Sequence, residues 1–354
     1  MKICVVGAGA IGGLLGARLA STGHEVSLVA RGAHLQAIRF DGLQLHMNDG
    51  SVIRATDLEA SNEIPSLGPH DLVILGLKAH QIEAVADELP SLFHDDTVVL
   101  TAQNGIPWWY FQRHGGPLDG TVLKSLDPEG RISRAINPQR IIGCIAYPAA
   151  EIMRPGVIRH IEGMRFPVGE LDGSDSERVR TVSALMTGAG FKSPILDNIR
   201  AEIWLKAWGN LSFNPISALT HSTLADICQH PDGHALAATM MTEAQAVAES
   251  LGISFRVPLE KRIAGAERVG KHKTSMLQDV ECGKALETEA IIGAVVELSE
   301  LTGVATPTIR AIYQAVRLLS HILVEETVCV RADALPDASG VTLPLKAVRA
   351  GTGR

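Results

Sequence analysis

Short apolar runs alternate with helix-like segments along the first half of the chain. In the helix-like segments apolar residues recur every three to four positions, whereas the runs between them are continuously apolar. Continuous runs of this kind are typical of strands in a parallel sheet that helices cover on both faces. The pattern therefore predicts an α/β fold with a doubly wound, mainly parallel sheet. The expected strands are residues 2–6, 26–29, 71–77, 97–101, 141–146 and 156–161.

The second half of the chain is mostly helical by the same criterion. A helix over residues 176–187, ended by Gly188, closes the strand-rich part, and Pro194 then interrupts the chain. A chain of 354 residues exceeds what one compact core usually holds. We therefore expect a sheet domain at 1–196, an all-helical domain at 197–325 and a C-terminal extension at 326–354. The helices expected in the second domain are residues 202–211, 234–251, 284–302 and 307–324, the last with Thr306 as its N-cap.

Composition and charge exclude several classes of protein. Apolar residues make up 46% of the chain and charged residues 20%, as in an ordinary globular protein, and the net charge is −7 without a long basic run. Binding to nucleic acid or to an anionic membrane surface therefore has no support. No apolar stretch reaches the roughly 18 residues of a membrane span, and the first strand begins at Lys2, which leaves no room for a signal peptide. The five cysteines form no CxxC pair and the thirteen histidines show no metal-ligand spacing, so we expect a cytoplasmic protein without disulfide bonds or a metal.

A glycine-rich turn joins the first two expected strands. Gly7-Ala8-Gly9-Ala10-Ile11-Gly12 follows the first strand at once and opens a helical stretch that runs to Gly23. In a dinucleotide site the first glycine permits the tight turn, the second lets the backbone approach the pyrophosphate, and the third allows close packing of helix on strand. The free N–H groups at the start of the helix then bind the phosphates. The motif therefore predicts a Rossmann-type domain whose cofactor contacts Gly7, Gly9, Ala10, Ile11 and Gly12.

Arg31 stands at the end of the second strand, where an NAD site usually has an Asp or Glu that accepts a hydrogen bond from the ribose 2′-hydroxyl. A guanidinium at this position suits a 2′-phosphate instead, so we expect NADP(H) as the cofactor. Two alternatives stay open: Arg31 is a solvated surface charge, or the glycine loop is a tight turn that holds no ligand.

A polar stripe crosses an otherwise apolar helix of the second domain. Lys206, Asn210 and Asn214 are spaced four residues apart and therefore lie on one face of that helix, among apolar neighbours such as Trp204. A lysine in such a setting needs a partner or a function. Either the stripe is catalytic, or the lysine extends to solvent while the asparagines bond loop backbone.

Polar residues also follow two of the expected strands. Asn104, in a Gln-Asn-Gly segment, follows the strand that ends at Thr101, and Lys78 with Gln81 follows the strand at 71–77. The carboxyl ends of parallel strands face the cofactor crevice, which makes these residues candidates for binding the substrate, the nicotinamide ribose or a phosphate. The alternatives are an ordinary Asn-Gly turn for Asn104 and a solvated loop charge for Lys78.

Three more candidates lie toward the end of the helical domain. Ser275 and Asp279 are four residues apart and either belong to the site or form a helix cap. Glu287 falls on the expected helix at 284–302, as a salt-bridge partner for Lys206 or as part of a solvated face.

Taken together, these segments resemble the ketopantoate reductase (2-dehydropantoate 2-reductase) family. The resemblance extends from Met1 to about Leu319, and several motifs in the same order are more specific than a glycine loop alone. The family fold is a Rossmann domain followed by an all-helical domain, which agrees with the predicted organisation. The motifs are the glycine turn with Ala30-Arg31-Gly32 and the segments 77–81, 103–105, 155–160, 198–214 and 275–289.

The resemblance implies that NADPH delivers hydride to the carbonyl carbon of a 2-keto acid, with ketopantoate favoured. It implies Lys206 as the general acid that protonates the developing alkoxide, and Glu287 as the carboxylate that orients the lysine. An ammonium at the carbonyl oxygen stabilises charge that develops only in the transition state. The implied substrate ligands are Asn104, Asn210, Asn214 and Ser275, and Asn104 is also placed at the nicotinamide side. The implied ligands of the adenosine 2′-phosphate are Arg31, Lys78 and Gln81.

Two other functions stay open. One is an NADP-dependent dehydrogenase of another hydroxy acid or of a polyol phosphate, whose sites also pair a helical Lys with an Asn four residues on. The other is a non-catalytic NADP-binding redox sensor, against which the intact set of polar residues argues. The segment 107–139, with Trp108-Trp109-Tyr110, is longer than in the short family members, so its aromatic residues either reshape the substrate pocket or pack an inserted helix. The sequence permits a homodimer without specifying one.

Overall fold

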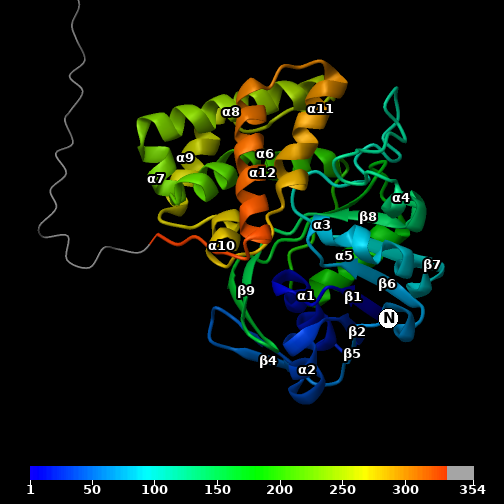
Figure 1. The fold of residues 1–354 in the computed structure, drawn as a ribbon. Helices are drawn as coiled ribbons and strands as arrows, with labels where there is room; N and C mark the ends of the chain where they lie inside the picture. The colour runs from blue at the N-terminus through cyan, green and yellow to red at the C-terminus, as the bar shows by residue number, and fades with distance from the viewer. Residues whose placement is uncertain (333–354) are drawn as a thin grey trace, which may run out of the picture.

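A parallel-rich sheet and a bundle of helices follow one another along the chain (Figure 1). The computed structural model describes residues 1–332. Most of the extension expected at 326–354 therefore lies outside the described residues. The predicted fold class, a Rossmann-type sheet followed by a helical region, is confirmed.

Seven strands form the main sheet, in the order β11-β8-β7-β6-β1-β2-β5. All neighbours run parallel except β11, which is antiparallel to β8. The chain moves outward from β1 to one edge and then returns to β6 on the other side of β1. Such a reversal of strand order opens a crevice at the carboxyl ends of the central strands. The strands are β1 (Lys2–Val6), β2 (Glu25–Val29), β5 (Glu59–Ser61), β6 (His70–Leu75), β7 (Phe93–Thr101), β8 (Ile141–Cys144) and β11 (Val168–Glu170).

Short helices connect these strands. The segment expected as a helix at 176–187 is α5, which begins after the N-cap Ser176 and includes Gly188 as its last residue. The Ser176 hydroxyl accepts a hydrogen bond from the backbone of Val179, as a good N-cap does. The helices and 3₁₀ turns are α1 (Ala10–Ala20), α2 (Gly32–Asp41), η1 (Ile64–Leu67), α3 (Ala79–Ile82), η2 (Glu83–Leu92), α4 (Arg131–Ala135), η3 (Pro138–Arg140) and α5 (Glu177–Gly188).

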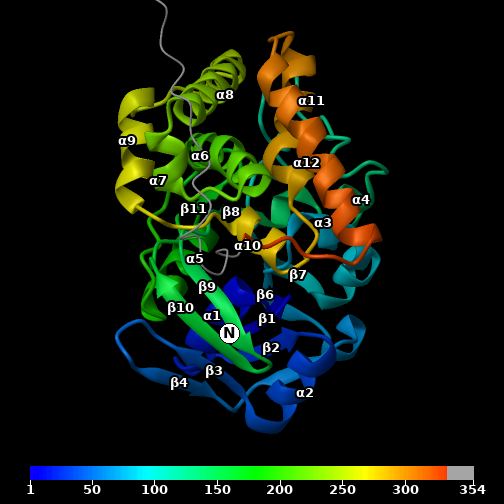
Figure 2. The same ribbon diagram turned by 60° about the vertical axis from the view of Figure 1, so that its left-hand side comes forward.

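A second sheet of four strands covers the outer face of α1 (Figure 2). Gly13 of α1 allows this contact, because a Cβ there would lie 2.8 Å from the Ile158 side chain. The sequence predicted the strand at 156–161 but not the sheet to which it belongs. Its strands are β4 (Val52–Ala55), β3 (Leu43–His46), β10 (Val157–Glu162) and β9 (Ala149–Arg154).

The helical region packs around α6, which begins after Asn198. The Asn198 side chain caps this helix by accepting a hydrogen bond from the backbone of Ala201 at 3.0 Å. Thr306 is the N-cap of α12, as expected, although the carboxylate of Glu243 rather than the Thr306 side chain accepts from the first turn. The helices are α6 (Ile199–Thr220), α7 (Leu224–Gln229), α8 (Pro231–Ser250), α9 (Leu259–Val269), α10 (Ser275–Glu281), α11 (Ala294–Thr302) and α12 (Pro307–Glu325).

The prediction of a helix at 284–302 is wrong for residues 284–287. Gly283 adopts a left-handed conformation with φ +62°, and the Lys284 N–H bonds back to Asp279, which ends α10. Helical structure resumes only beyond Glu287, with a π-helical segment at Glu289–Gly293 that leads into α11. Glu287 therefore lies in a loop and not on a helix.

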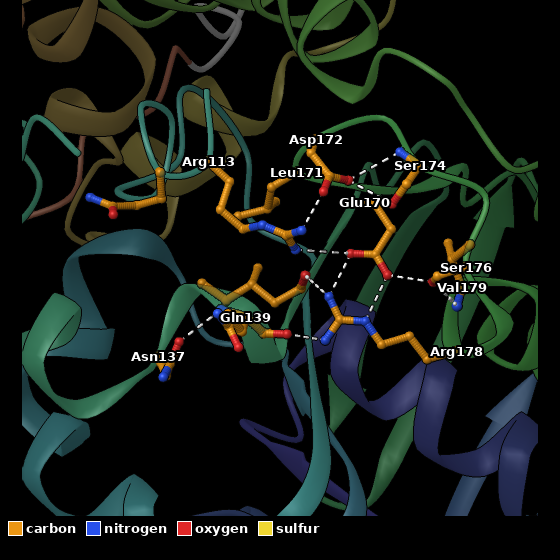
Figure 3. A network of polar contacts seen from close by, with 12 residues as sticks. Arg113, Asn137, Gln139, Glu170, Leu171, Asp172, Ser174, Ser176, Arg178 and Val179 are labelled. Atoms are coloured by element: carbon orange, nitrogen blue, oxygen red, sulfur yellow. Dashed lines mark hydrogen bonds and ion pairs between the residues drawn. The ribbon is translucent and has the colours of Figure 1, made fainter. Parts of the chain in front are cut away.

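A polar network ties the segment 107–139 to the edge of the main sheet (Figure 3). Glu170 of β11 is only 1% exposed, and its carboxylate accepts from Arg178 Nε at 2.6 Å. Arg113 of the inserted segment lies 3.7 Å from the same carboxylate and pairs with Asp172. This network anchors the insertion at β11 and α5.

The aromatic residues of the insertion are buried in turns, not in an inserted helix. Trp109 donates from its ring nitrogen to the Thr101 hydroxyl at 3.0 Å, and the Tyr110 hydroxyl accepts from Trp204 at 2.7 Å. These contacts join the insertion to β7 and α6.

Candidate active site

A cavity of about 400 Å³ opens at the carboxyl ends of β1 and β2. Gly7 turns the chain with φ +100°, and a Cβ at Gly12 would lie 2.0 Å from the Gly7 carbonyl oxygen, so both positions require glycine. A Cβ at Gly9 would meet nothing within 4 Å, which leaves the backbone open toward the cavity. No side chain caps the start of α1 at Ala10 and Ile11, so its N–H groups are available to an anion. The loop therefore fits the phosphates of a dinucleotide.

Arg31 and Gln81 line this cavity, whereas Lys78 does not. Arg31 is exposed at the N-cap of α2, two residues after the end of β2. The Lys78 ammonium turns toward the helical region, where it lies 2.5 Å from Asp279 Oδ2. Gln81 fixes the backbone of Lys78, because its Oε1 accepts from the Lys78 N–H at 3.2 Å.

Two histidines of the cofactor cavity escaped the sequence analysis. His34 Nδ1 accepts from the Gly156 N–H at 3.0 Å, so Nε2 donates to the Ala8 carbonyl at 2.8 Å. His34 thus ties the glycine loop to the second sheet, and burial lowers its pKa. His80 lines the same cavity, and burial lowers its pKa too. Both histidines line the cavity because segments distant in the sequence meet there, and no local pattern in the sequence reveals this.

A second cavity, of about 380 Å³, lies between the sheet and the helical region. Ile11 of the glycine loop reaches this cleft, so it adjoins the start of α1. The polar stripe of α6 faces it, as the four-residue spacing predicts. The candidate residues that the structure brings together here are Asn104, Lys206, Asn210, Asn214 and Ser275.

Lys206 is held in the wall of the cleft by two acceptors. Its Nζ donates to Asn104 Oδ1 at 2.7 Å and to the Ala146 carbonyl oxygen. The Tyr147 ring lies 5.8 Å from Nζ, within the range of a cation–π contact. Burial lowers the pKa of the Lys206 ammonium to about 8, while the negative charge of Glu287 acts in the opposite direction. The lysine is therefore poised to release a proton near neutral pH.

The expected salt bridge between Lys206 and Glu287 is replaced by a relay through an amide. Glu287 is 8% exposed, and its Oε2 accepts from Asn104 Nδ2 at 3.3 Å. Its Oε1 accepts from the Ala79 N–H at 3.3 Å. Because the loop after Gly283 sets Glu287 behind Asn104, the carboxylate acts on the lysine through the amide and through space.

Asn214 and Ser275 close the far end of the stripe. Asn214 Nδ2 donates to the Ser275 hydroxyl at 3.4 Å. Ser275 is the first residue of α10, but the cap is Thr274, whose hydroxyl accepts from the Leu277 N–H at 3.3 Å. The Ser275 hydroxyl is thus not used as a cap and faces the cleft.

Ketopantoate reductase family models match two segments of the chain. The model of the N-terminal part, described as ketopantoate reductase PanE/ApbA, matches residues 3–173, and the model of the C-terminal part matches residues 198–320. A 2-dehydropantoate 2-reductase of Mesorhizobium japonicum is 52% identical over 90% of this chain and 98% of its own length. The chain belongs to the ketopantoate reductase family. This is a family of nicotinamide-dependent oxidoreductases.

Solved structures of the same fold include more than one activity. A protein of Ralstonia solanacearum assigned as a ketopantoate reductase is 39% identical, with a TM-score of 0.86 over 90% of this chain and 98% of its own. A D-mandelate dehydrogenase bound to NADH and anilino(oxo)acetate is 26% identical, with a TM-score of 0.78 over 91% of this chain and 99% of its own.

The part of the chain that the structure describes, residues 1–332, contains no helix long and apolar enough to cross a membrane. Within the same residues no group of His, Cys, Asp and Glu is arranged to hold a metal ion. All five cysteines are free, three of them buried.

Proposed function

We propose that this protein reduces 2-dehydropantoate (ketopantoate) to pantoate with NADPH, in the cytoplasm. The observation that carries the proposal is the Lys206 ammonium, which is held by Asn104 and Ala146 in the wall of a cleft next to the glycine loop. The 52% identity to a 2-dehydropantoate 2-reductase over nearly its whole length supports the choice of substrate.

In this mechanism the chain supplies the proton and the charge. The reduced nicotinamide, when bound, supplies a hydride to the carbonyl carbon. Lys206 donates its proton to the carbonyl oxygen as negative charge develops there, which typically accelerates such a step by about 10²–10⁴-fold. Asn104 fixes the direction of the ammonium, and Glu287 keeps it charged through the hydrogen bond to Asn104. Asn210, Asn214 and Ser275 bind the substrate's other oxygens.

The preference for NADPH depends on Arg31. Arg31 lines the cofactor cavity together with Gln81, and its guanidinium suits a 2′-phosphate there. The pyrophosphate would be held by the glycine-rich turn, through Gly7, Gly9, Ala10, Ile11 and Gly12. Lys78 can contribute to phosphate binding only if its ion pair with Asp279 opens.

The test is the loss of NADPH absorbance with ketopantoate, beside pyruvate, 2-ketoisovalerate and acetoacetate. Rapid turnover of ketopantoate alone supports the proposal, and tight NADPH binding without turnover of ketopantoate refutes it.

The structural likeness to a D-mandelate dehydrogenase favours a second candidate, an NAD-linked dehydrogenase of a 2-hydroxy acid. Faster reduction of phenylglyoxylate with NADH than of ketopantoate with NADPH would select this candidate.

A further inference from the structure

Arg262 is a cation in the substrate cleft with no role in the mechanism above. It belongs to α9, which forms one wall of the cleft together with Ala266 and Val269. Among the described residues, Lys206 and Arg262 are the only lysine or arginine side chains that line this cleft. The carboxylate of Glu162 lines the cleft as well, but the two cations outnumber it, so the cleft suits an anion in a chain whose net charge is −7.

Within the described residues, the Arg262 guanidinium has no hydrogen-bond or ion-pair partner. It makes no side-chain hydrogen bond and no ion pair with any residue in 1–332, and its Nε is a fully buried donor without an acceptor. Arg200, the buried arginine of the described residues, donates instead to the carbonyl oxygens of Tyr110 and Gln112. Buried polar groups are almost always paired, so an unpaired guanidinium that lines a cavity indicates a ligand that supplies the acceptors.

Gly209 makes room for this guanidinium on α6. A Cβ at Gly209 would lie 2.5 Å from Arg262 Nη2 and 3.1 Å from Cζ. Gly209 comes three residues after Lys206 and directly before Asn210, on the face of the helix that lines the cleft. Residues three apart on a helix are neighbours on its surface, so the guanidinium lies about one helical turn from the base of the catalytic lysine.

We propose that Arg262 binds the carboxylate of the 2-keto acid; this assignment rests on the proposed function. In a 2-keto acid the carboxylate carbon is bonded directly to the carbonyl carbon, so the anion must lie beside the group that Lys206 protonates. A planar guanidinium matches a carboxylate with two parallel hydrogen bonds. Asn210, Asn214 and Ser275 are neutral and are then free to read the hydroxyl and the remaining oxygens. Arg262 is in this view the residue that selects acids over neutral ketones.

The test compares an acid with its neutral form in matched variants. Ketopantoate and its neutral lactone are reduced with NADPH by the wild type, Arg262→Gln, Arg262→Lys and Gly209→Ala. Arg268→Gln is the control, because it removes the same charge from an exposed position on the same helix. NADPH binding, followed by fluorescence, reports that each variant is folded, since the cofactor cavity lies elsewhere.

We expect Arg262→Gln to lower kcat/KM for the acid by about 10–100-fold, mainly through KM, because a hydrogen bond to a charged group is worth that factor. For the lactone, kcat/KM should change by less than about threefold, since the lactone has no carboxylate. Arg262→Lys should recover part of the loss. In Gly209→Ala the new methyl group displaces the guanidinium, so kcat/KM for the acid should again fall and kcat/KM for the lactone should not.

Equal losses for acid and lactone, or wild-type kinetics with the acid in Arg262→Gln, overturn the assignment of Arg262 while leaving the proposed function intact. A wild-type enzyme that binds NADPH but does not reduce ketopantoate overturns the proposed function, and the Arg262 assignment with it. These two failures are distinguished by the wild-type measurement alone.

Discussion

Removal of the Glu287 charge should lower the pH at which kcat/KM for reduction begins to decline. Burial lowers the pKa of Lys206 to about 8, and the charge of Glu287 raises it. The reductive direction needs the protonated lysine, so kcat/KM should be constant below this pKa and fall as pH rises through it. In Glu287→Gln the opposing charge is lost, the pKa of Lys206 falls further, and the decline should begin at lower pH.

The size of this change follows from the geometry. Asn104 connects the two groups through bonds of 2.7 Å to Lys206 and 3.3 Å to Glu287. With the amide between them, the charges lie within about 8 Å, where two unit charges interact by about 2 kcal/mol at an effective dielectric of about 20. Because one pH unit corresponds to about 1.4 kcal/mol, the falling limb should move by about 1.5 pH units. Activity relative to wild type should then drop roughly 25-fold at pH 8.5 but little at pH 6.

The assay is kcat/KM for ketopantoate with saturating NADPH between pH 5.5 and about 10, and the reverse oxidation of pantoate over the same range. Oxidation needs the neutral lysine as a base, so its rising limb should move with the falling limb of reduction. Glu289→Gln is the control, since that carboxylate accepts from Tyr313 at 2.7 Å and not from Asn104. An unchanged limb in Glu287→Gln, or a shift to higher pH, would refute the coupling of Glu287 to Lys206.

Three further predictions concern the acid, the cofactor and the scaffold. Lys206→Ala should lower kcat by about 10²-fold or more with NADPH affinity kept, and normal turnover in this variant would remove Lys206 as the acid. Arg31→Ala should weaken NADPH far more than NADH in fluorescence titrations; equal losses would show that Arg31 does not read the 2′-phosphate. Glu170→Gln should destabilise the fold by about 3 kcal/mol in urea unfolding, because it leaves the Arg178 guanidinium without its charge partner, whereas the exposed carboxylate in Asp175→Asn should leave the midpoint unchanged.

Local patterns predicted the parts of the site that depend on one segment. The glycine loop could be predicted because Gly7 and Gly12 meet steric demands within a single βα turn. The polar stripe on α6 could be predicted because helical periodicity alone places Lys206 and its two asparagines on one face. The fold class followed from the alternation of apolar runs and helical segments.

The remaining features depend on contacts between distant segments. The periodicity of its neighbours predicts a helix at Glu287, whereas Gly283 ends the preceding helix α10 and leaves Glu287 in a loop. Of the second sheet the sequence predicts only the strand at 156–161, because the pairing of β10 with β3 and β9 depends on contacts between distant segments. No pattern within α9 predicts that Arg262 lines the cleft, because its guanidinium is accommodated by Gly209, which belongs to α6.

By sequence, the aromatic residues of the segment 107–139 either reshape the substrate pocket or pack an inserted helix, and the structure argues for a different source of specificity. The polar atoms of Trp109 and Tyr110 form hydrogen bonds with Thr101 and Trp204 inside the core. None of the residues of the insertion lines the cleft that holds Lys206. Trp108 lines a separate cavity of about 200 Å³. The walls of the substrate cleft come instead from α6, α9, the start of α10 and residues 146–150. The choice among 2-keto acids should therefore respond to substitutions in α9 and at these residues, while substitutions of the buried aromatic residues should act on stability.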